Sequence, residues 1–158
     1  MRQWVLSVPY PLRLLLARDP KILSDVLGIV YRVISNFLIK RAGETHKTSC
    51  TGAVTLIQRF GSALNLNIHY HMLFLDGIYI KPSERSDLVF KKQSNLLPEE
   101  IQALTEKICK RVLGYLERHG LIEGNIESRY LSGDLLSEDD CILGIQVSSM
   151  TYRILVYI

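Results

Sequence analysis

One stretch of the sequence, residues 67–76, constrains the fold more than any other. Aromatic and aliphatic side chains fill it, and it ends at Asp76 and Gly77, a pair typical of a turn. An apolar run bounded by turn residues predicts a β-strand. His69 and His71 lie one residue apart in this run, so a strand would place both imidazoles on one face. Because the residues that follow are apolar on both faces, we expect a central strand covered on both sides.

The histidine pair allows two interpretations. At about 3.3 Å per residue, the α-carbons of His69 and His71 would lie about 6.6 Å apart on a strand. Two imidazoles at this spacing can converge on one metal ion, for which histidine is a common ligand. Two polar residues near the edge of a sheet would give the same pattern, because a bare His-x-His pair is common. The pattern alone therefore leaves both interpretations open.

A second strand is predicted before the histidine strand, from Ala53 to Phe60, with a turn over residues 61–65. If the two strands form a hairpin centred on this turn, Gln58 lies opposite His69 and on its face. A slip of one residue would place Arg59 there instead. Gln58 would offer a third metal ligand, whereas Arg59 would offer a clamp for a phosphate. Both registers remain open at this stage.

Two long helices are predicted on either side of the hairpin. Asp19 and Pro20 favour a helix start, because aspartate caps free N–H groups and proline fits the first helical position. A second helix opens at Pro98 and stops at Gly120. Apolar residues recur at helical spacing in both, so each needs a large partner such as a sheet. We therefore predict an α+β fold, with long helices on an antiparallel sheet that carries the His-x-His motif and extends through residues 77–79.

The composition fits one soluble domain. The chain has 158 residues, of which 47% are hydrophobic and 22% are charged, which is ordinary for a globular protein with a real core. No apolar run reaches the roughly 18 to 20 residues of a membrane span, and the first residues lack the plan of a signal peptide. We therefore predict a cytoplasmic protein that does not contact membranes. The three cysteines are widely spaced and odd in number, which argues against a disulfide framework.

Positive charge is concentrated in the first part of the chain. Residues 1–60 contain nine Lys or Arg against three acidic residues, whereas the remainder contains ten against thirteen. A basic front part is suited to facing phosphates. A solvated helix surface explains the same charges equally well.

Five stretches match a known family of proteins. They are residues 2–7 (RQWVLS), 11–15 (PLRLL), 51–63 (TGAVTLIQRFGSA) and 66–71 (LNIHYH), with a weaker match at residues 151–154 (TYRI). In these stretches the chain resembles the transposases of two-tyrosine rolling-circle insertion sequences and their relatives in common-region elements. The resemblance runs over nearly the whole chain and is most specific from Gly52 to His71.

The resemblance implies an HUH endonuclease, named for histidine, a bulky apolar residue and histidine. Here the motif is His69-Tyr70-His71, with tyrosine in the middle place. Such proteins have an RRM-like or ferredoxin-like antiparallel sheet, and their two histidines bind Mg²⁺ or Mn²⁺, which polarises the scissile phosphate of single-stranded DNA. A tyrosine from a later helix attacks this phosphate and keeps the 5′ end as a phosphotyrosine. The partner implied is single-stranded DNA at the ends of the element.

The site residues that follow from this resemblance fall into two groups. The expected metal ligands are His69, His71 and Gln58, and the residues assigned to DNA contact are Arg59, Lys40 and Arg41. Two departures from the family pattern qualify the expected activity. We expect the family's zinc-binding front segment to be missing, and the family's catalytic tyrosines lie after the matched region. We therefore expect a single core domain over residues 1–158, truncated at its C-terminal end, with a metal site but without its nucleophile.

Two other interpretations compete with this one. The chain could be a competent nuclease that uses one of its own tyrosines or a metal-bound water. It could also be a non-enzymatic remnant that self-associates or pairs with another chain through its terminal strand, residues 151–158. Whether the chain is an enzyme therefore stays open at the level of sequence.

Overall fold

A four-stranded antiparallel sheet forms the centre of the protein. The computed structural model describes residues 1–83, 86–125, 128–131 and 153–157. The sheet has the strand order β3-β4-β1-β9, and all its neighbouring strands are antiparallel. Its strands are β1 (Arg2–Ser7), β3 (Ala53–Phe60), β4 (Leu66–Phe74) and β9 (Arg153–Tyr157).

Three helices connect these strands and define the topology. They are α1 (Tyr10–Arg18), α2 (Pro20–Arg41) and α3 (Pro98–Arg118). α1 and α2 stand between β1 and β3 in the chain, and α3 stands between β4 and β9. With β1 and β4 in the centre of the sheet, this succession is the β-α-β-β-α-β arrangement of ferredoxin-like folds. The α+β class predicted from the sequence is confirmed.

The helix boundaries follow the predicted capping signals. The Asp19 carboxylate accepts hydrogen bonds from the backbone N–H groups of Lys21 at 2.8 Å and Ile22 at 3.1 Å, so it caps α2 as predicted. α3 begins at Pro98 and ends before Gly120, whose φ of +64° suits the end of a helix.

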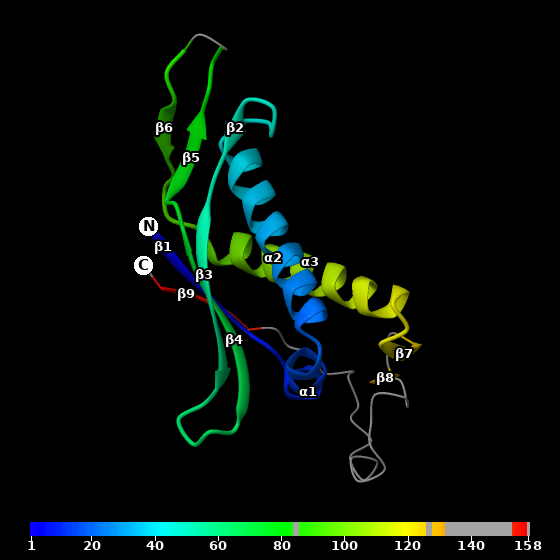
Figure 1. Cartoon of the computed structure of the whole chain (residues 1–158). Coiled ribbons are helices and arrows are strands. Elements are labelled where there is room, and N and C mark those ends of the chain that lie inside the picture. The colour runs from blue at the N-terminus through cyan, green and yellow to red at the C-terminus, as the bar shows by residue number, and fades with distance from the viewer. Residues whose placement is uncertain (84–85, 126–127, 132–152, 158) are drawn as a thin grey trace.

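The hydrophobic core lies between the sheet and the helices. The side chains of Trp4 on β1 and of Tyr70 and Phe74 on β4 are fully buried, and they point to the face on which α2 packs. The Tyr70 hydroxyl donates to the carbonyl of Leu23 at 3.0 Å, and the Phe74 ring stacks on Tyr31. Figure 1 shows α2 and α3 crossing one another beside the sheet. Burial of these large rings against α2 is therefore what orients the central strands.

The opposite face of the sheet is open over β3 and β4. Val54 and Leu56 on β3 are 64% and 68% exposed, and Leu73 on β4 is 40% exposed. The sequence predicted cover on both faces, and for this part of the sheet that prediction is wrong. The helices that the structure describes pack on the other face, so the apolar residues beside the histidines face solvent.

A second sheet continues the hairpin beyond the main sheet. It contains β2 (Ser49–Cys50), β5 (Gly77–Ile80) and β6 (Val89–Lys92) in the order β2-β5-β6. The prediction that residues 77–79 extend the main sheet is therefore wrong. The ladders of β4 with β1 and β3 both reach as far as Phe74, and β5 then pairs with β2 and β6 instead.

Two further elements complete the described chain. β7 (Ile122–Asn125) and β8 (Ser128–Leu131) form a two-stranded ladder after α3. The strand predicted at the end of the sequence is confirmed for residues 153–157, where β9 pairs with β1.

α2 is long and apolar enough to cross a membrane by length and composition alone. The prediction from sequence had found no stretch of this kind. Half of the apolar window of α2 is buried inside the protein, which is the behaviour of a core helix in a soluble domain.

Candidate metal centre on the open sheet face

The hairpin register places Gln58 beside the histidines. β3 and β4 pair with Gln58 opposite His69 and Leu56 opposite His71, which confirms the first of the two registers. The alternative with Arg59 opposite His69 is wrong. The ladder shifts between Gln58 and Phe60, so that two residues of β4 oppose Arg59 alone. Alternation along β3 directs Arg59 away from the face of Gln58.

Gln58 and His71 lie in direct contact. Gln58 Oε1 and His71 Nε2 are 3.0 Å apart, and the Gln58 amide nitrogen donates to the Phe60 carbonyl at 2.9 Å. The second bond turns the amide oxygen toward the imidazole. For Mg²⁺ in octahedral geometry with bonds of about 2.1 Å, neighbouring ligand atoms lie about 3.0 Å apart. In the structure this separation is that of a hydrogen bond in which the His71 N–H donates to Gln58 Oε1. The two atoms are close enough to become adjacent ligands of one ion once Nε2 has lost this proton.

His69 is oriented by β1. Its Nδ1 lies 2.8 Å from the Ser7 hydroxyl, which the β1–β4 register brings opposite it. This contact leaves Nε2 for another partner, as in metal-binding histidines whose second nitrogen is held by a neighbouring group. The rings of His69 and His71 have their centroids 6.1 Å apart. Ser7 was not singled out from the sequence, because only the strand register reveals it.

The surroundings of His69 favour its neutral form. Partial burial lowers the pKa of His69 below its ordinary value, and the charges of His71 and Arg13 lower it further. A neutral imidazole is the form that can bind a metal ion. His69 therefore needs little deprotonation to act as a ligand near neutral pH.

Arg13 is a cation near the site that sequence reasoning missed. It lies on α1, where its Nε donates to the Val8 carbonyl at 3.0 Å and its Nη1 to the Leu66 carbonyl at 3.4 Å. These bonds hold the guanidinium between the ends of β1 and β4, close enough to His69 to affect its pKa. Only the packing of α1 against β4 brings Arg13 to the histidine end of the sheet.

The donor set of the site is neutral. Within the described ranges, three or more His, Cys, Asp or Glu side chains do not gather anywhere. Two imidazoles and one amide would therefore have to hold a divalent cation without a carboxylate. Such a set fits an ion whose remaining charge is balanced by a phosphate.

The basic residues assigned to DNA lie at different places. Lys40 and Arg41 are at the C-terminal end of α2, which packs on the face of the sheet away from the histidines, and Lys40 is exposed. Arg59 is also exposed, on β3. The structure thus brings His69, His71 and Gln58 together but does not bring these cations to them. Their contacts with DNA stay predictions.

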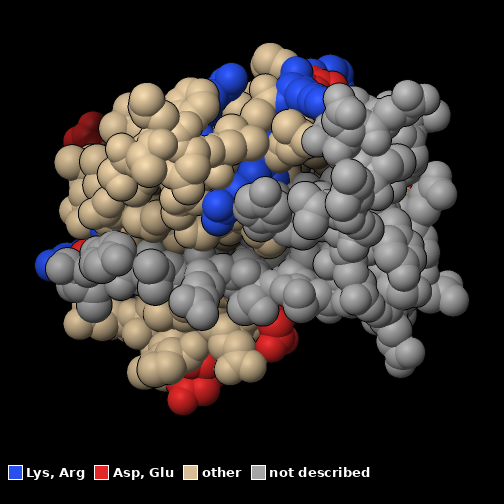
Figure 2. All heavy atoms as spheres, turned by 90° about the horizontal axis from the view of Figure 1, so that it is seen from below, with Lys and Arg blue, Asp and Glu red and all other residues tan. Residues whose placement is uncertain are grey.

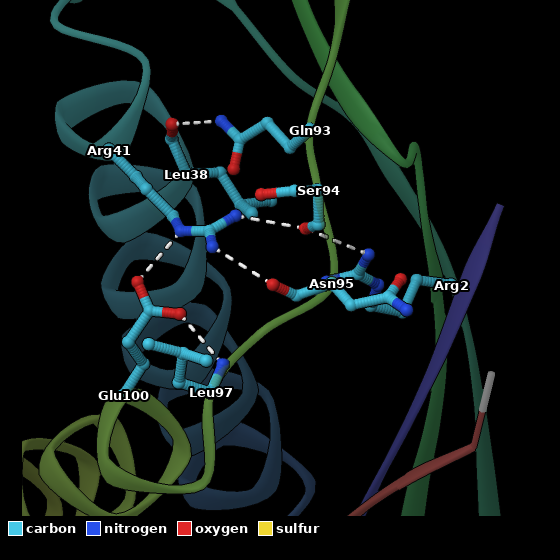
Figure 3. A network of polar contacts seen from close by, with 8 residues as sticks. All are labelled: Arg2, Leu38, Arg41, Gln93, Ser94, Asn95, Leu97 and Glu100. Atoms are coloured by element: carbon cyan, nitrogen blue, oxygen red, sulfur yellow. Dashed lines mark hydrogen bonds and ion pairs between the residues drawn. The ribbon is translucent and has the colours of Figure 1, made fainter.

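Arg41 has a structural role that the sequence did not suggest. Its guanidinium donates to the Glu100 carboxylate at 2.7 Å and to the carbonyls of Ser94 and Asn95 at 2.9 and 3.0 Å. Figure 3 shows these bonds joining the end of α2 to the loop before α3. The same loop is held by Gln93, whose amide donates to the Leu38 carbonyl.

Three tyrosines whose side chains are described are bound into the structure. Tyr31 donates to the Thr51 carbonyl at 3.1 Å, and Tyr70 is fully buried, which raises its pKa. Burial and the Asp25 carboxylate, 2.7 Å away, raise the pKa of Tyr115 to about 12. A raised pKa makes phenolate formation harder, so Tyr70 and Tyr115 are poor candidates for a nucleophile. The side chains of Tyr10, Tyr130, Tyr152 and Tyr157 lie outside the described part.

The open face has the character of a contact surface rather than a deep pocket. The exposed apolar side chains Val54, Leu56 and Leu73 lie on the same face as the histidines by strand alternation. Figure 2 shows the molecule from below, where most of the described surface is uncharged and Lys, Arg, Asp and Glu lie at separate places. A long, flat ligand would fit such a face better than a small molecule.

Comparison with known proteins yields one match. A family model described as "Putative transposase" matches residues 52–140, more than half of the chain. The matched range begins just before β3 and includes Gln58, His69 and His71. No curated protein and no solved structure shows a significant match.

Proposed function

Because the chain belongs to this transposase family and has a transposition-related function, we propose that it is an HUH-type domain that binds single-stranded DNA and a divalent metal ion. His69, His71 and Gln58 hold Mg²⁺ or Mn²⁺ on the open face of the sheet. The observation that carries this proposal is the approach of Gln58 Oε1 to His71 Nε2 beside His69. These are the three residues that the sequence predicted as ligands.

The chemistry of the site suits a phosphodiester substrate. A bound Mg²⁺ or Mn²⁺ would polarise the scissile phosphate and balance charge that develops on it. The protein's part is to keep His69 neutral and oriented through Ser7, and to place Gln58 against His71. Because all three ligands are neutral, the DNA phosphate supplies the negative charge at the site. Metal and DNA therefore bind cooperatively.

The proposal places the nucleophile outside the described tyrosines that are tied into the core. Tyr31, Tyr70 and Tyr115 each donate a hydrogen bond to a group on the helix side of the sheet or on α2. None of the three is available on the histidine face. We therefore expect none of these three tyrosines to nick DNA.

The alternative of pairing through the terminal strand stays a prediction. One edge of β9 is already paired with β1 of the same chain. Self-association through this strand would therefore use its other edge.

Metal binding is tested by the melting temperature with and without Mn²⁺. At about 100 times the dissociation constant, a ligand adds about 2.7 kcal/mol to the free energy of unfolding. For a chain of this size that is a rise of about 5 to 10 °C. His69→Ala/His71→Ala is expected to abolish the rise. His46→Ala is the matched control, because His46 is exposed in a loop away from this face.

DNA binding and nicking are tested with labelled single-stranded DNA. We expect tighter Mn²⁺ binding when the oligonucleotide is present, and no covalent band on a denaturing gel. A Mn²⁺-induced rise that survives His69→Ala/His71→Ala would refute the assigned ligands. A covalent band that disappears in His69→Ala would show that a tyrosine of this chain does act as the nucleophile.

A further inference from the structure

A pair of exposed aromatic rings lies on the second sheet. Tyr79 on β5 and Phe90 on β6 are paired in the ladder, with ring centroids 5.1 Å apart. Tyr79 is 37% exposed and Phe90 is 42% exposed. Exposed aromatic rings in contact with each other, on a surface that no described element covers, call for an explanation.

Lysines flank the two rings on the same face. Lys92 is opposite Gly77 in the ladder, two residues from Phe90, and is exposed. Lys81 follows Tyr79 by two residues and is also exposed, and its N–H donates to the Thr48 carbonyl, which continues the strand. Alternation places both lysines on the face of the rings. Rings between cations are the combination that binds single-stranded nucleic acids, through stacking of bases and contact with phosphates.

The opposite face of this sheet is occupied by the protein itself. Ile78 is fully buried in the core, and the Lys91 ammonium donates to the Ala42 carbonyl at the end of α2. Ile78 and Lys91 are paired in the ladder and face α2. Tyr79 and Phe90, the next pair along the ladder, therefore face away from it. Lys91 supports the fold, whereas Lys81 and Lys92 are left for a ligand.

The aromatic face and the histidine face lie on the same side of the molecule. In the main sheet, Tyr70 and Phe74 contact α2, so His69 and His71 point away from it. α2 also contacts β5, and Ile78 of β5 belongs to the same buried core as the apolar residues of α2. Figure 1 shows β5 and β6 extending beyond the main sheet, at the end away from the β3–β4 turn. From His71 to Tyr79 the chain spans at most about 26 Å at about 3.3 Å per residue.

We propose that a second contact surface for single-stranded DNA is formed by Tyr79, Phe90, Lys81 and Lys92. It binds the same DNA strand that passes through the histidine site. This inference rests on the proposed DNA binding. Bases of the strand stack on Tyr79 and Phe90, and neighbouring phosphates contact the two lysines. Exposed Leu73 lies between the two sites on the same face. Stacking requires unpaired bases, so the surface selects single strands over duplexes.

The first test measures binding of a single-stranded oligonucleotide of about 20 nucleotides, which exceeds typical site sizes. Tyr79→Ala/Phe90→Ala is expected to weaken binding about tenfold or more, because each lost stacking contact is worth at least several-fold. The logarithm of the DNA-binding constant falls linearly with the logarithm of the salt concentration, with a slope of about 0.7 for each phosphate contact to a single strand. Lys81→Ala/Lys92→Ala removes two such contacts and is expected to reduce the magnitude of this slope by about 1.4. Leu97→Ala and Lys110→Ala are matched controls, since both residues are exposed on or beside α3. Circular dichroism melting confirms that each variant folds.

The second test is photocrosslinking to an oligonucleotide that contains 5-iododeoxyuridine. Crosslinks at Tyr79 or Phe90, mapped by mass spectrometry, are the expected result. One outcome would overturn the second contact surface but leave the proposed function standing. In that outcome the wild-type chain binds the oligonucleotide, Tyr79→Ala/Phe90→Ala binds it equally well, and the crosslinks map only to the main sheet. If the wild-type chain binds no single-stranded DNA, the proposed function fails with this surface. Loss of a dimer in Tyr79→Ala/Phe90→Ala, with unchanged DNA affinity, would instead assign the surface to contact between copies.

Discussion

The Arg41→Ala variant separates a structural role for this residue from a role in DNA contact. Arg41 is 19% exposed and forms an ion pair with Glu100, which is 25% exposed. It also donates to two backbone carbonyls of the loop before α3. Each hydrogen bond from Arg41 to a carbonyl should contribute about 1 kcal/mol to the free energy of unfolding, because water can reach these groups. The ion pair should contribute about 0.5 kcal/mol. Arg41→Ala should therefore lower the free energy of unfolding by about 2 to 3 kcal/mol.

The ion pair is isolated by a double-mutant cycle with Glu100→Gln. Glu100 accepts the N–H of Leu97 at 2.9 Å, and glutamine retains this cap of α3 while removing the charge. Chemical denaturation of the four proteins should give a coupling of about 0.5 kcal/mol between the two positions. The adjacent residue supplies the control, because Lys40→Ala removes an exposed charge and should cost less than about 0.5 kcal/mol.

The pH dependence of the same variant gives a second readout. Burial raises the pKa of Glu100, but the hydrogen bonds from Leu97 and Arg41 and the charge of Arg41 outweigh burial, so the pKa lies below the ordinary value of a glutamate. A depressed carboxyl pKa stabilises the fold above the unfolded value, and this contribution is lost as the pH falls through the folded value. The acid-dependent loss should therefore be smaller in Arg41→Ala. A wild-type-like stability in Arg41→Ala, together with weaker DNA binding, would refute the structural role and support DNA contact.

Three further substitutions test the local geometry. Asp19→Ala should lower the unfolding free energy by about 1 kcal/mol in urea denaturation, and an unchanged midpoint would rule out the cap. Tyr115→Phe should destabilise the protein at neutral pH. Its deficit relative to wild type should shrink as the pH rises from 10 toward about 12, because burial and the bond to Asp25 both favour the protonated phenol and raise the pKa of Tyr115 to about 12. A deficit independent of pH would contradict the raised pKa. Ser7→Ala should weaken Mn²⁺ binding about tenfold, measured by calorimetry, because His69 loses the group that orients it; unchanged affinity would exclude this role.

Local sequence signals predicted most of the secondary structure. The Asp19 cap, the start of α3 at Pro98 and the strand from Ala53 to Phe60 all lie where the sequence placed them. Each signal is local, since a cap satisfies backbone groups within one turn and strand alternation depends on neighbouring residues. The pairing of Gln58 with His69 was one of the two registers that the sequence left open, and the structure confirms it.

The errors concern contacts between distant parts of the chain. Leu73 and Leu56 are apolar but exposed, because cover for a sheet face depends on which helices pack there. Residues 77–79 continue the strand pattern but belong to another sheet, because the partner of a strand is chosen by the whole fold. Arg41 could not be assigned to the loop before α3 from its position at a helix end.

The sequence by itself predicted the helix starts and the two strands of the hairpin, and it named Gln58, His69 and His71 as candidate ligands, because these signals depend on residues close together in the chain. The choice between the two hairpin registers was left to the structure, which pairs Gln58 with His69. The tertiary structure alone decided that Ser7 and Arg13 stand beside His69, since β1 and α1 meet β4 across more than fifty residues. It also decided that α2 contacts the inner face of both sheets, which leaves the histidines and the Tyr79–Phe90 pair on the same side. Long-range packing minimises exposed apolar area over the whole chain, and no local pattern encodes that minimum.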